Sequence, residues 1–179
     1  MPMEAATLER AYVQVYTGNG KGKTTAALGL ALRAAGAGMR VYFAQFIKHG
    51  RFNEMVALER YADRVTVRQF GRGRFIQGDA TDSDLAAARQ GLAEIRMAVG
   101  SGDYRVVVLD EANVAMQCGL LCVQDILALV AEAHPGVELV ITGRDAPVEL
   151  IERADLVTEM KEVKHYYHSG VMAREGIEK

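Results

Sequence analysis

Residues 17–25 read Thr17-Gly18-Asn19-Gly20-Lys21-Gly22-Lys23-Thr24-Thr25, a glycine-rich stretch that contains Gly-Lys-Thr. A run of strand-forming residues precedes it at 12–16, and a run rich in alanine and leucine follows it at 26–33. A strand, a glycine-rich turn and a helix in this order are the setting of a phosphate-binding P-loop. Glycines let successive backbone N–H groups converge on one anion, and the positive end of the helix faces the same point. The stretch therefore predicts nucleotide binding.

Two side chains of this loop are expected to act on the nucleotide directly. Lys23 supplies a mobile positive charge for the outer phosphates, and the Thr24 hydroxyl is placed to hold Mg²⁺. The usual P-loop has a glycine five residues before Gly22, where this chain has Thr17, so the loop is a variant. A flexible glycine turn that only caps a helix is the simpler alternative. The predicted nucleotide-binding residues of the loop are Gly18, Asn19, Gly20, Lys21, Gly22, Lys23, Thr24 and Thr25.

The composition is that of a globular protein. The chain has 179 residues, of which 50% are hydrophobic and 25% are charged. The formal net charge of −2 gives no support for binding nucleic acid or a membrane surface. No apolar run approaches the roughly 20 residues that span a bilayer, and the first residues lack the pattern of a signal peptide. Cys118 and Cys122 are most simply free thiols in a reducing cytoplasm.

Strand-like and helix-like segments alternate along the rest of the chain. Further strands are predicted at residues 39–47, 65–70, 104–109, 137–142 and 156–160. Further helices are predicted at 52–62, 81–99, 123–133 and 147–154. Short connections between alternating segments predict an α/β, P-loop NTPase-like fold, with a doubly wound, mostly parallel sheet of about six strands. We expect residues 1–179 to form a single domain.

A second part of a nucleotide site follows the most apolar of these strands. Asp110 and Glu111 come directly after residues 106–109, which read Val-Val-Val-Leu. The carboxyl ends of parallel strands form the ligand-binding edge of an open α/β sheet, so both carboxylates are expected near the P-loop. The predicted metal ligands are Thr24, Asp110 and Glu111. A solvated acidic turn is the simpler alternative.

Fold and phosphate loop do not identify a reaction, and a kinase, an NTPase and a nucleotidyl or alkyl transferase all fit them. Further segments narrow the choice: 18–25 (GNGKGKTT), 45–48 (QFIK), 109–115 (LDEANVA), 142–147 (TGRDAP), 154–165 (ADLVTEMKEVKH) and 170–178 (GVMAREGIE). In this order they closely resemble the P-loop ATP:corrinoid adenosyltransferases, from about Val13 to Glu178. The P-loop alone is a weak indication of that family, whereas the segments together are specific.

The resemblance implies an alkyl transfer. In that family the Co(I) of cob(I)alamin, or of its precursor cob(I)yrinic acid a,c-diamide, attacks the 5′-carbon of ATP, and the whole triphosphate leaves. No water has to be activated, so the protein must supply position and charge neutralisation. The expected catalytic residues are Lys21, Lys23 and Glu111, with Mg²⁺ or Mn²⁺ as cofactor. The family also binds ATP reversed along the P-loop, and Thr17 is compatible with a changed nucleotide path.

Other site residues follow from the same resemblance. Arg33 and Arg144 match nucleotide-contacting positions, with salt-bridged surface arginines as the alternative. The segment of Gln45, Phe46 and Lys48 matches one beside the active site, with an ordinary strand end as the alternative. The reduced corrinoid is expected near residues 71–79, and the corrinoid-binding residues are predicted to be Phe46, Gly71, Gly73, Arg74 and Phe75.

Two features depart from the family or remain open. Familiar members carry an aromatic pair after the Gly-x-Gly of this loop, which displaces the lower axial ligand of cobalt. Here Arg74, Phe75 and Ile76 follow Gly73, so the pair is absent in register. The histidines of the segment 165–168 are predicted to pack over the sheet edge rather than bind a metal.

The resemblance also implies a homodimer in the cytoplasm that receives electrons from a flavoprotein or another reductase, with no nucleic-acid or membrane partner. A P-loop ATPase or kinase-like regulator is the rival interpretation, and a nucleotide-binding protein without turnover is a third. The sequence leaves open whether the acceptor is complete cobalamin or an early intermediate, and which reductase serves it.

Overall fold

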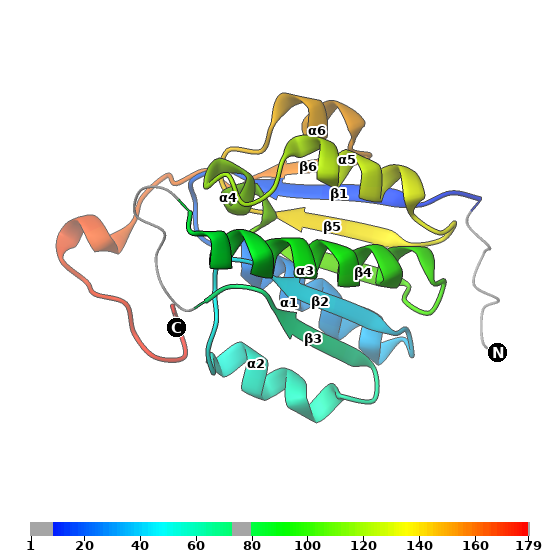
Figure 1. The fold of residues 1–179 in the computed structure, drawn as a ribbon. Coiled ribbons are helices and arrows are strands. Elements are labelled where there is room, and N and C mark those ends of the chain that lie inside the picture. Colours follow the sequence, from blue (N-terminus) through cyan, green and yellow to red (C-terminus); the bar gives the residue numbers. More distant parts are fainter. Residues whose placement is uncertain (1–8, 73–79, 179) are drawn as a thin grey trace.

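A six-stranded sheet forms the centre of the structure, a computed structural model that describes residues 9–72 and 80–178 (Figure 1). The strands lie in the order β3-β2-β4-β5-β1-β6, and every neighbouring pair is parallel. Their bounds are β1 Tyr12–Thr17, β2 Val41–Gln45, β3 Val65–Gln69, β4 Val106–Asp110, β5 Glu138–Thr142 and β6 Leu156–Glu159. The predicted parallel α/β sheet is confirmed.

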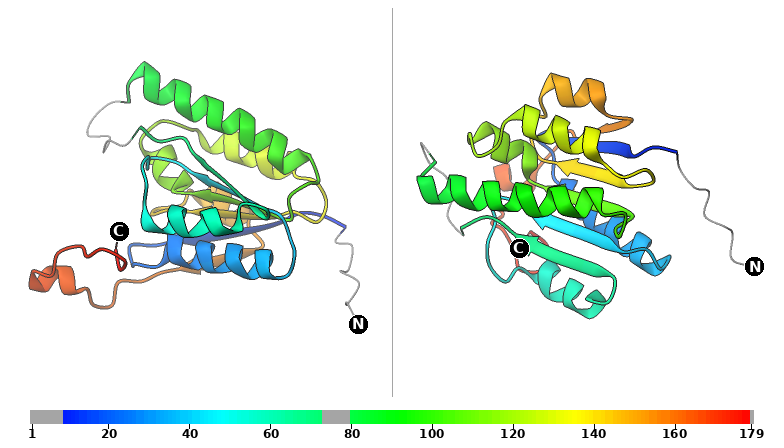
Figure 2. Two further views of the ribbon diagram at one scale, coloured as in Figure 1. Left: turned by 90° about the horizontal axis from the view of Figure 1, so that it is seen from below. Right: turned by 45° about the vertical axis from the view of Figure 1, so that its right-hand side comes forward.

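Helices cover both faces of the sheet (Figure 2), which makes it doubly wound as predicted. Their bounds are α1 Lys23–Gly36, α2 Asn53–Leu58, α3 Asp82–Gly100, α4 Ala112–Gln117, α5 Val123–Glu132 and α6 Val148–Arg153, with short 3₁₀ turns at Glu59–Tyr61 and Tyr166–Ser169. Helices α1 and α2 share one buried apolar cluster, and α3, α4, α5 and α6 share the other. No helix in the described ranges is long and apolar enough to cross a membrane.

The central strand β4 shows how the sequence builds both clusters. Its run Val106–Asp110 is buried throughout. Successive strand side chains point to opposite faces, so Val107 and Leu109 join the α3 side while Val106 and Val108 join the α1 side. A strand covered on both faces needs such an unbroken apolar run, which explains why it was recognisable in the sequence.

The strand order brings the functional segments to one edge. Because all strands are parallel, the last residues of β1, β2, β4 and β5 end on the same side of the sheet. Strand β5 lies between β1, which leads into the P-loop, and β4, which ends at Asp110. After β6, residues 160–178 leave the sheet and turn back toward the beginning of α1 (Figure 2).

Candidate functional site

The P-loop lies closely against the chain that follows β6. Gly18 and Gly22 have φ angles of 91° and 121°, in the left-handed region that favours glycine. The Gly20 N–H donates to the Met160 carbonyl (2.6 Å), and a Cβ on Gly20 would lie 2.7 Å from that oxygen. A Cβ on Gly18 would lie 2.5 Å from the same oxygen. These glycines are therefore needed for the shape of the loop and also for the close approach of Met160.

Lys23 is the first residue of α1 and is 8% exposed. Its Nζ donates to the carbonyl oxygens of Gly18 (2.6 Å) and Gly20 (2.7 Å), so the ammonium closes the loop from inside. Burial lowers the pKa of Lys23, and the nearby positive charge of Arg144 acts in the same direction. The ammonium therefore lies inside the loop, where it can contact a bound anion.

Asp110 is fully buried beneath the P-loop and accepts hydrogen bonds from three elements. Its Oδ1 accepts from the hydroxyls of Thr24 (2.9 Å) and Thr142 (2.7 Å), and its Oδ2 accepts from Gln45 Nε2 (2.9 Å). The carboxylate therefore ties the ends of β2, β4 and β5 to the start of α1. Because the Thr24 hydroxyl donates to this carboxylate, Asp110 fixes the orientation of the Thr24 side chain.

Glu111 instead faces the open side of the site. It has φ 59° and ψ 21°, a left-handed conformation that is uncommon outside glycine, and its N–H donates to the Thr142 hydroxyl (3.1 Å). Burial raises the pKa of Glu111, and the charge of Asp110 raises it further. Strained backbone at a carboxylate of this kind is typical of functional sites.

Lys48 is brought to the site by a second strained turn. Ile47 has φ 65°, which is an outlier for a β-branched residue, and the Lys48 N–H donates to the Phe46 carbonyl (2.6 Å). Gly71 packs against this turn so closely that a Cβ would lie 2.2 Å from the Ile47 carbonyl oxygen. Gly71 thus supports the turn that presents Lys48.

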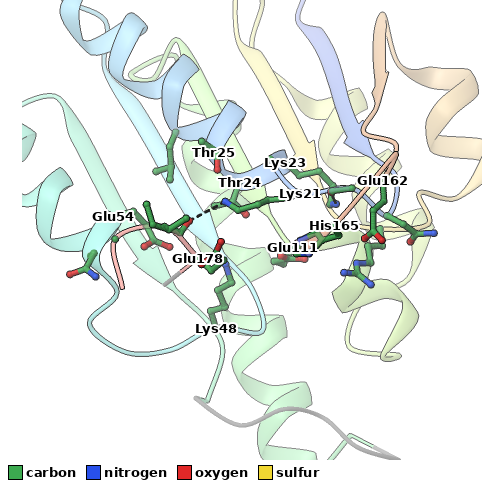
Figure 3. A pocket seen from close by; sticks show the side chains of 18 residues that line it. Lys21, Lys23, Thr24, Thr25, Lys48, Glu54, Glu111, Glu162, His165 and Glu178 are labelled. Carbon is green, nitrogen blue, oxygen red and sulfur yellow. Dashed lines mark hydrogen bonds between the residues drawn. The ribbon is translucent and has the colours of Figure 1, made fainter. Parts of the chain in front are cut away.

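These residues surround a cavity of about 610 Å³ (Figure 3). Four positively charged side chains line it: Lys21, Lys23, Lys48 and Arg144. The side chains of Lys48 and Arg144 make no hydrogen bond or ion pair within the described ranges, and the Lys48 ammonium lies 5.9 Å from the centre of the Phe52 ring. The remaining lining residues are Asn19, Gly20, Gly22, Thr24, Thr25, Leu28, Asn53, Glu54, Glu111, Glu162, His165, Gly176, Ile177 and Glu178.

The C-terminal segment forms one wall of this cavity. Lys21 Nζ donates to the Ile177 carbonyl (3.0 Å), shown as a dashed line in Figure 3. Glu178 is hydrogen-bonded to the Tyr166 hydroxyl and paired with Arg174 (3.2 Å), which folds the segment onto itself. His165 lines the cavity, and no group of three or more potential metal ligands occurs among the His, Cys, Asp and Glu residues that the structure describes.

Some predicted site residues lie elsewhere. Arg33 is exposed in the last turn of α1, about 15 Å along the helix axis from Lys23, and does not line the cavity. Phe46 is 1% exposed and packs on Phe70, with ring centroids 5.9 Å apart, so its side chain is part of the core. The predicted corrinoid contacts at Gly73, Arg74 and Phe75 lie outside the described residues.

Gln45 was expected beside the active site, but other residues of the site were not predicted. Thr142 ends an apolar strand with a polar side chain, as Gln45 does, and that position was a usable signal. Asn53 and Glu54 begin the short helix α2, whose pattern gave no such signal.

Comparisons with known proteins show the family of this chain. Residues 9–178 match the family model described as ATP:corrinoid adenosyltransferase BtuR/CobO/CobP. The corrinoid adenosyltransferase of Pseudomonas aeruginosa is 37% identical over 172 residues, which cover 95% of this chain and 84% of that protein. That of Escherichia coli K12 is 35% identical, covering 95% and 86%. Corrinoid adenosyltransferase CobA of Salmonella typhimurium is 34% identical, also covering 95% and 86%.

Proposed function

This chain belongs to the ATP:corrinoid adenosyltransferase family and is such an enzyme, and we propose that its cavity binds ATP with the triphosphate on the P-loop and C5′ open to a Co(I) corrinoid. One observation carries the proposal. The P-loop, the carboxylate of Glu111 and two cations whose side chains form no hydrogen bond or ion pair within the described residues, Lys48 and Arg144, line the same cavity at the carboxyl edge of the sheet. That combination suits a polyanionic leaving group.

The reaction needs no proton transfer. An electron pair of Co(I) forms the Co–C5′ bond, the C5′–O bond breaks, and its electrons leave with the triphosphate. Negative charge therefore builds up on the phosphate side, and groups that meet it there lower the barrier. Holding C5′ in line with the cobalt lowers the barrier further, because the reacting atoms are already oriented.

We assign charge neutralisation to the cations of the cavity. Lys23 exchanges its hydrogen bonds with Gly18 and Gly20 for contacts with phosphate oxygens. The guanidinium of Arg144 forms no hydrogen bond or ion pair within the described part of the chain, and its planar N–H groups match the geometry of a phosphate. Lys21 and Lys48 add charge at the rim.

The donor set at the P-loop fits a magnesium ion shared with the nucleotide. Mg²⁺ prefers oxygen ligands and is usually held by one or two protein groups together with substrate phosphates. Thr24 and Glu111 both line the cavity and supply such oxygens, whereas Asp110 holds the Thr24 hydroxyl in place. When bound, the ion would neutralise charge on the triphosphate. Mn²⁺ has the same ligand preference.

We place the corrinoid at the open end of the cavity near Lys48 and the loop of residues 71–79. Gly71 packs against the turn that presents Lys48, which puts the start of that loop beside the cavity. We propose that Gly73, Arg74 and Phe75 contact the corrinoid. The buried side chain of Phe46 is not assigned a corrinoid contact, and Arg33, which does not line the cavity, is not assigned a nucleotide contact.

The family resemblance also leads us to propose a homodimer in the cytoplasm that receives electrons from a flavoprotein or another reductase. Free Cys118 and Cys122 are consistent with a reducing compartment. Sedimentation equilibrium of the purified protein tests the dimer, since a monomer at micromolar concentration would contradict it.

The reaction itself is tested by mixing the protein with MgATP and chemically reduced cob(I)alamin without oxygen. Conversion of the Co(I) absorption spectrum to that of adenosylcobalamin is expected, and it should depend on both ATP and Lys23. The same spectra without protein provide the control. A Co(I) spectrum that persists in the presence of the protein, with either corrinoid, would contradict the proposal.

A further inference from the structure

One hydrogen bond joins the beginning of the P-loop to the connection that carries Arg144. Thr17 is the last residue of β1 and is 8% exposed, and its hydroxyl accepts from the N–H of Ala146 (3.1 Å). Ala146 lies between β5 and α6, two residues after Arg144. Glycine, which the usual P-loop has at position 17, has no side chain that could accept this bond.

The connection 143–147 has a constrained backbone. Gly143 has φ 134° and Asp145 has φ 49°, so the residues on both sides of Arg144 are left-handed. A Cβ on Gly143 would lie 2.8 Å from Cβ of Asn113, so the connection also packs tightly on α4. Three further hydrogen bonds hold it: Gly143 N–H to Tyr16 O (3.1 Å), Asn113 Nδ2 to Gly143 O (2.9 Å) and Gln117 Nε2 to Asp145 Oδ2 (2.8 Å).

The Thr17 bond is the one that ties this connection to the residue from which the P-loop starts. The carbonyl of Thr17 also accepts from the Met160 N–H (2.8 Å), and Met160 in turn supports Gly20 of the loop. Thr17 thus lies where β6, the P-loop and the Arg144 connection meet. A shift of the connection relative to the P-loop would have to break its hydroxyl contact.

The contact between Thr17 and Ala146 affects ligand binding through Arg144. Its guanidinium lines the cavity, and no other residue of the described ranges forms a hydrogen bond or ion pair with it. Its charge acts on Lys23, which places the two cations within electrostatic range of each other. A guanidinium binds phosphate oxygens through paired N–H groups, and that geometry requires a fixed backbone.

We propose that Thr17 is a positioning residue, whose hydroxyl holds the Arg144 connection against the P-loop so that both bind the same triphosphate. The inference rests on the proposed function only for the identity of the ligand. It concerns the affinity for MgATP, which can be measured without a corrinoid.

The test is a set of MgATP titrations by calorimetry on wild type, Thr17→Val, Thr17→Ser and Arg144→Ala. Valine keeps the shape but removes the hydroxyl, so the dissociation constant should rise about fivefold to tenfold, the range for one lost hydrogen bond. Serine keeps the hydroxyl and should stay within about twofold of wild type. In the Arg144→Ala background, Thr17→Val should cause no further loss, because the group that it positions is gone.

Thermal unfolding shows whether each variant is folded. If Thr17→Val does not fold, Thr17→Ala, which removes the same hydroxyl without adding bulk, takes its place. An equal effect of the hydroxyl loss with and without Arg144 would overturn the proposal, since the residue would then act on the P-loop or on the fold alone. Equal affinities of Thr17→Val and wild type would overturn it as well. Normal MgATP binding without adenosyl transfer would contradict the proposed function but leave this inference standing.

Discussion

Replacing Thr142 by valine tests the buried network beneath the nucleotide site. The Thr142 side chain is fully buried, donates to Asp110 Oδ1 (2.7 Å) and accepts from the Glu111 N–H (3.1 Å). Valine has nearly the same shape, so the change removes both hydrogen bonds and leaves no large cavity.

The expected loss in free energy of unfolding follows from the groups that lose their hydrogen-bond partner. A hydrogen bond to a charged group is worth about 1.5–3 kcal/mol, and a stranded buried N–H costs about 1–3 kcal/mol. The added methyl group returns about 0.8 kcal/mol by burial. The net loss is therefore about 3 kcal/mol, which for a chain of this size lowers Tm by roughly 6–12 °C.

The assay is thermal unfolding followed by circular dichroism, with Thr142→Ser as the matched control. Serine keeps the hydroxyl and loses one buried methyl group, so it should cost only about 1 kcal/mol. Thr142→Val should also weaken Mg²⁺-dependent ATP binding, because Glu111 loses the contact that fixes its backbone. If the valine variant melts within about 2 °C of wild type, or if serine is equally damaging, the network does not have the assigned role.

Four further predictions concern the P-loop and its acidic partner. Lys23→Ala should lower single-turnover transfer at least about a hundredfold, from ~3 kcal/mol of lost charge stabilisation, and activity within about threefold would remove Lys23 from the site. Glu111→Gln should weaken the response to Mg²⁺ in metal titrations, and an unchanged titration would count against Glu111 as a ligand. Burial raises the pKa of Glu111, so its ionised form destabilises the fold at neutral pH. Glu111→Gln should therefore melt at a higher temperature than wild type at neutral pH. This gain should vanish below the pKa that Glu111 has in the unfolded chain, where the carboxyl group is protonated in both states. Gly20→Ala should reduce ATP affinity, because its Cβ would collide with the Met160 carbonyl oxygen. The control Gly29→Ala, whose Cβ would have nothing within 4 Å, should bind ATP normally and gain up to about 1 kcal/mol of stability. Equal ATP affinities of the two variants would refute the steric argument.

The fold was predictable because most of its elements carry local signals. The buried run of β4 and the glycine-rich turn before α1 are read directly from residue types. Helix α4 was missed, because it has six residues and begins after the left-handed Glu111 instead of a capping side chain. The strand order was not predicted either, since it depends on how the crossovers pack.

The site was predictable where its residues adjoin the motifs. Lys21, Lys23, Thr24 and Glu111 all line the cavity, as does Arg144. The contacts of Asp110 with Gln45 and Thr142 require β4 to lie between β2 and β5, and residue patterns do not contain that order. The wall formed by residues 176–178 belongs to an irregular segment, which has no periodicity to interpret.

The position of Arg33 relative to the P-loop follows from helix geometry. Arg33 matched a family position, yet the rise of an α-helix already places it about 15 Å along the helix axis from Lys23. In the structure Arg33 is exposed in the last turn of α1 and does not line the cavity.

The bond that breaks in ATP distinguishes adenosyl transfer from hydrolysis and phosphoryl transfer. Adenosyl transfer requires cleavage between C5′ and its oxygen, whereas an ATPase or kinase cleaves at the γ-phosphorus. Anaerobic incubation with MgATP and excess cob(I)alamin, followed by ion chromatography of the phosphates, separates these outcomes. We expect equal amounts of inorganic triphosphate and adenosylcobalamin, with ATP intact when the corrinoid is omitted. Release of ADP without the corrinoid, and no triphosphate with it, would contradict adenosyl transfer by this protein.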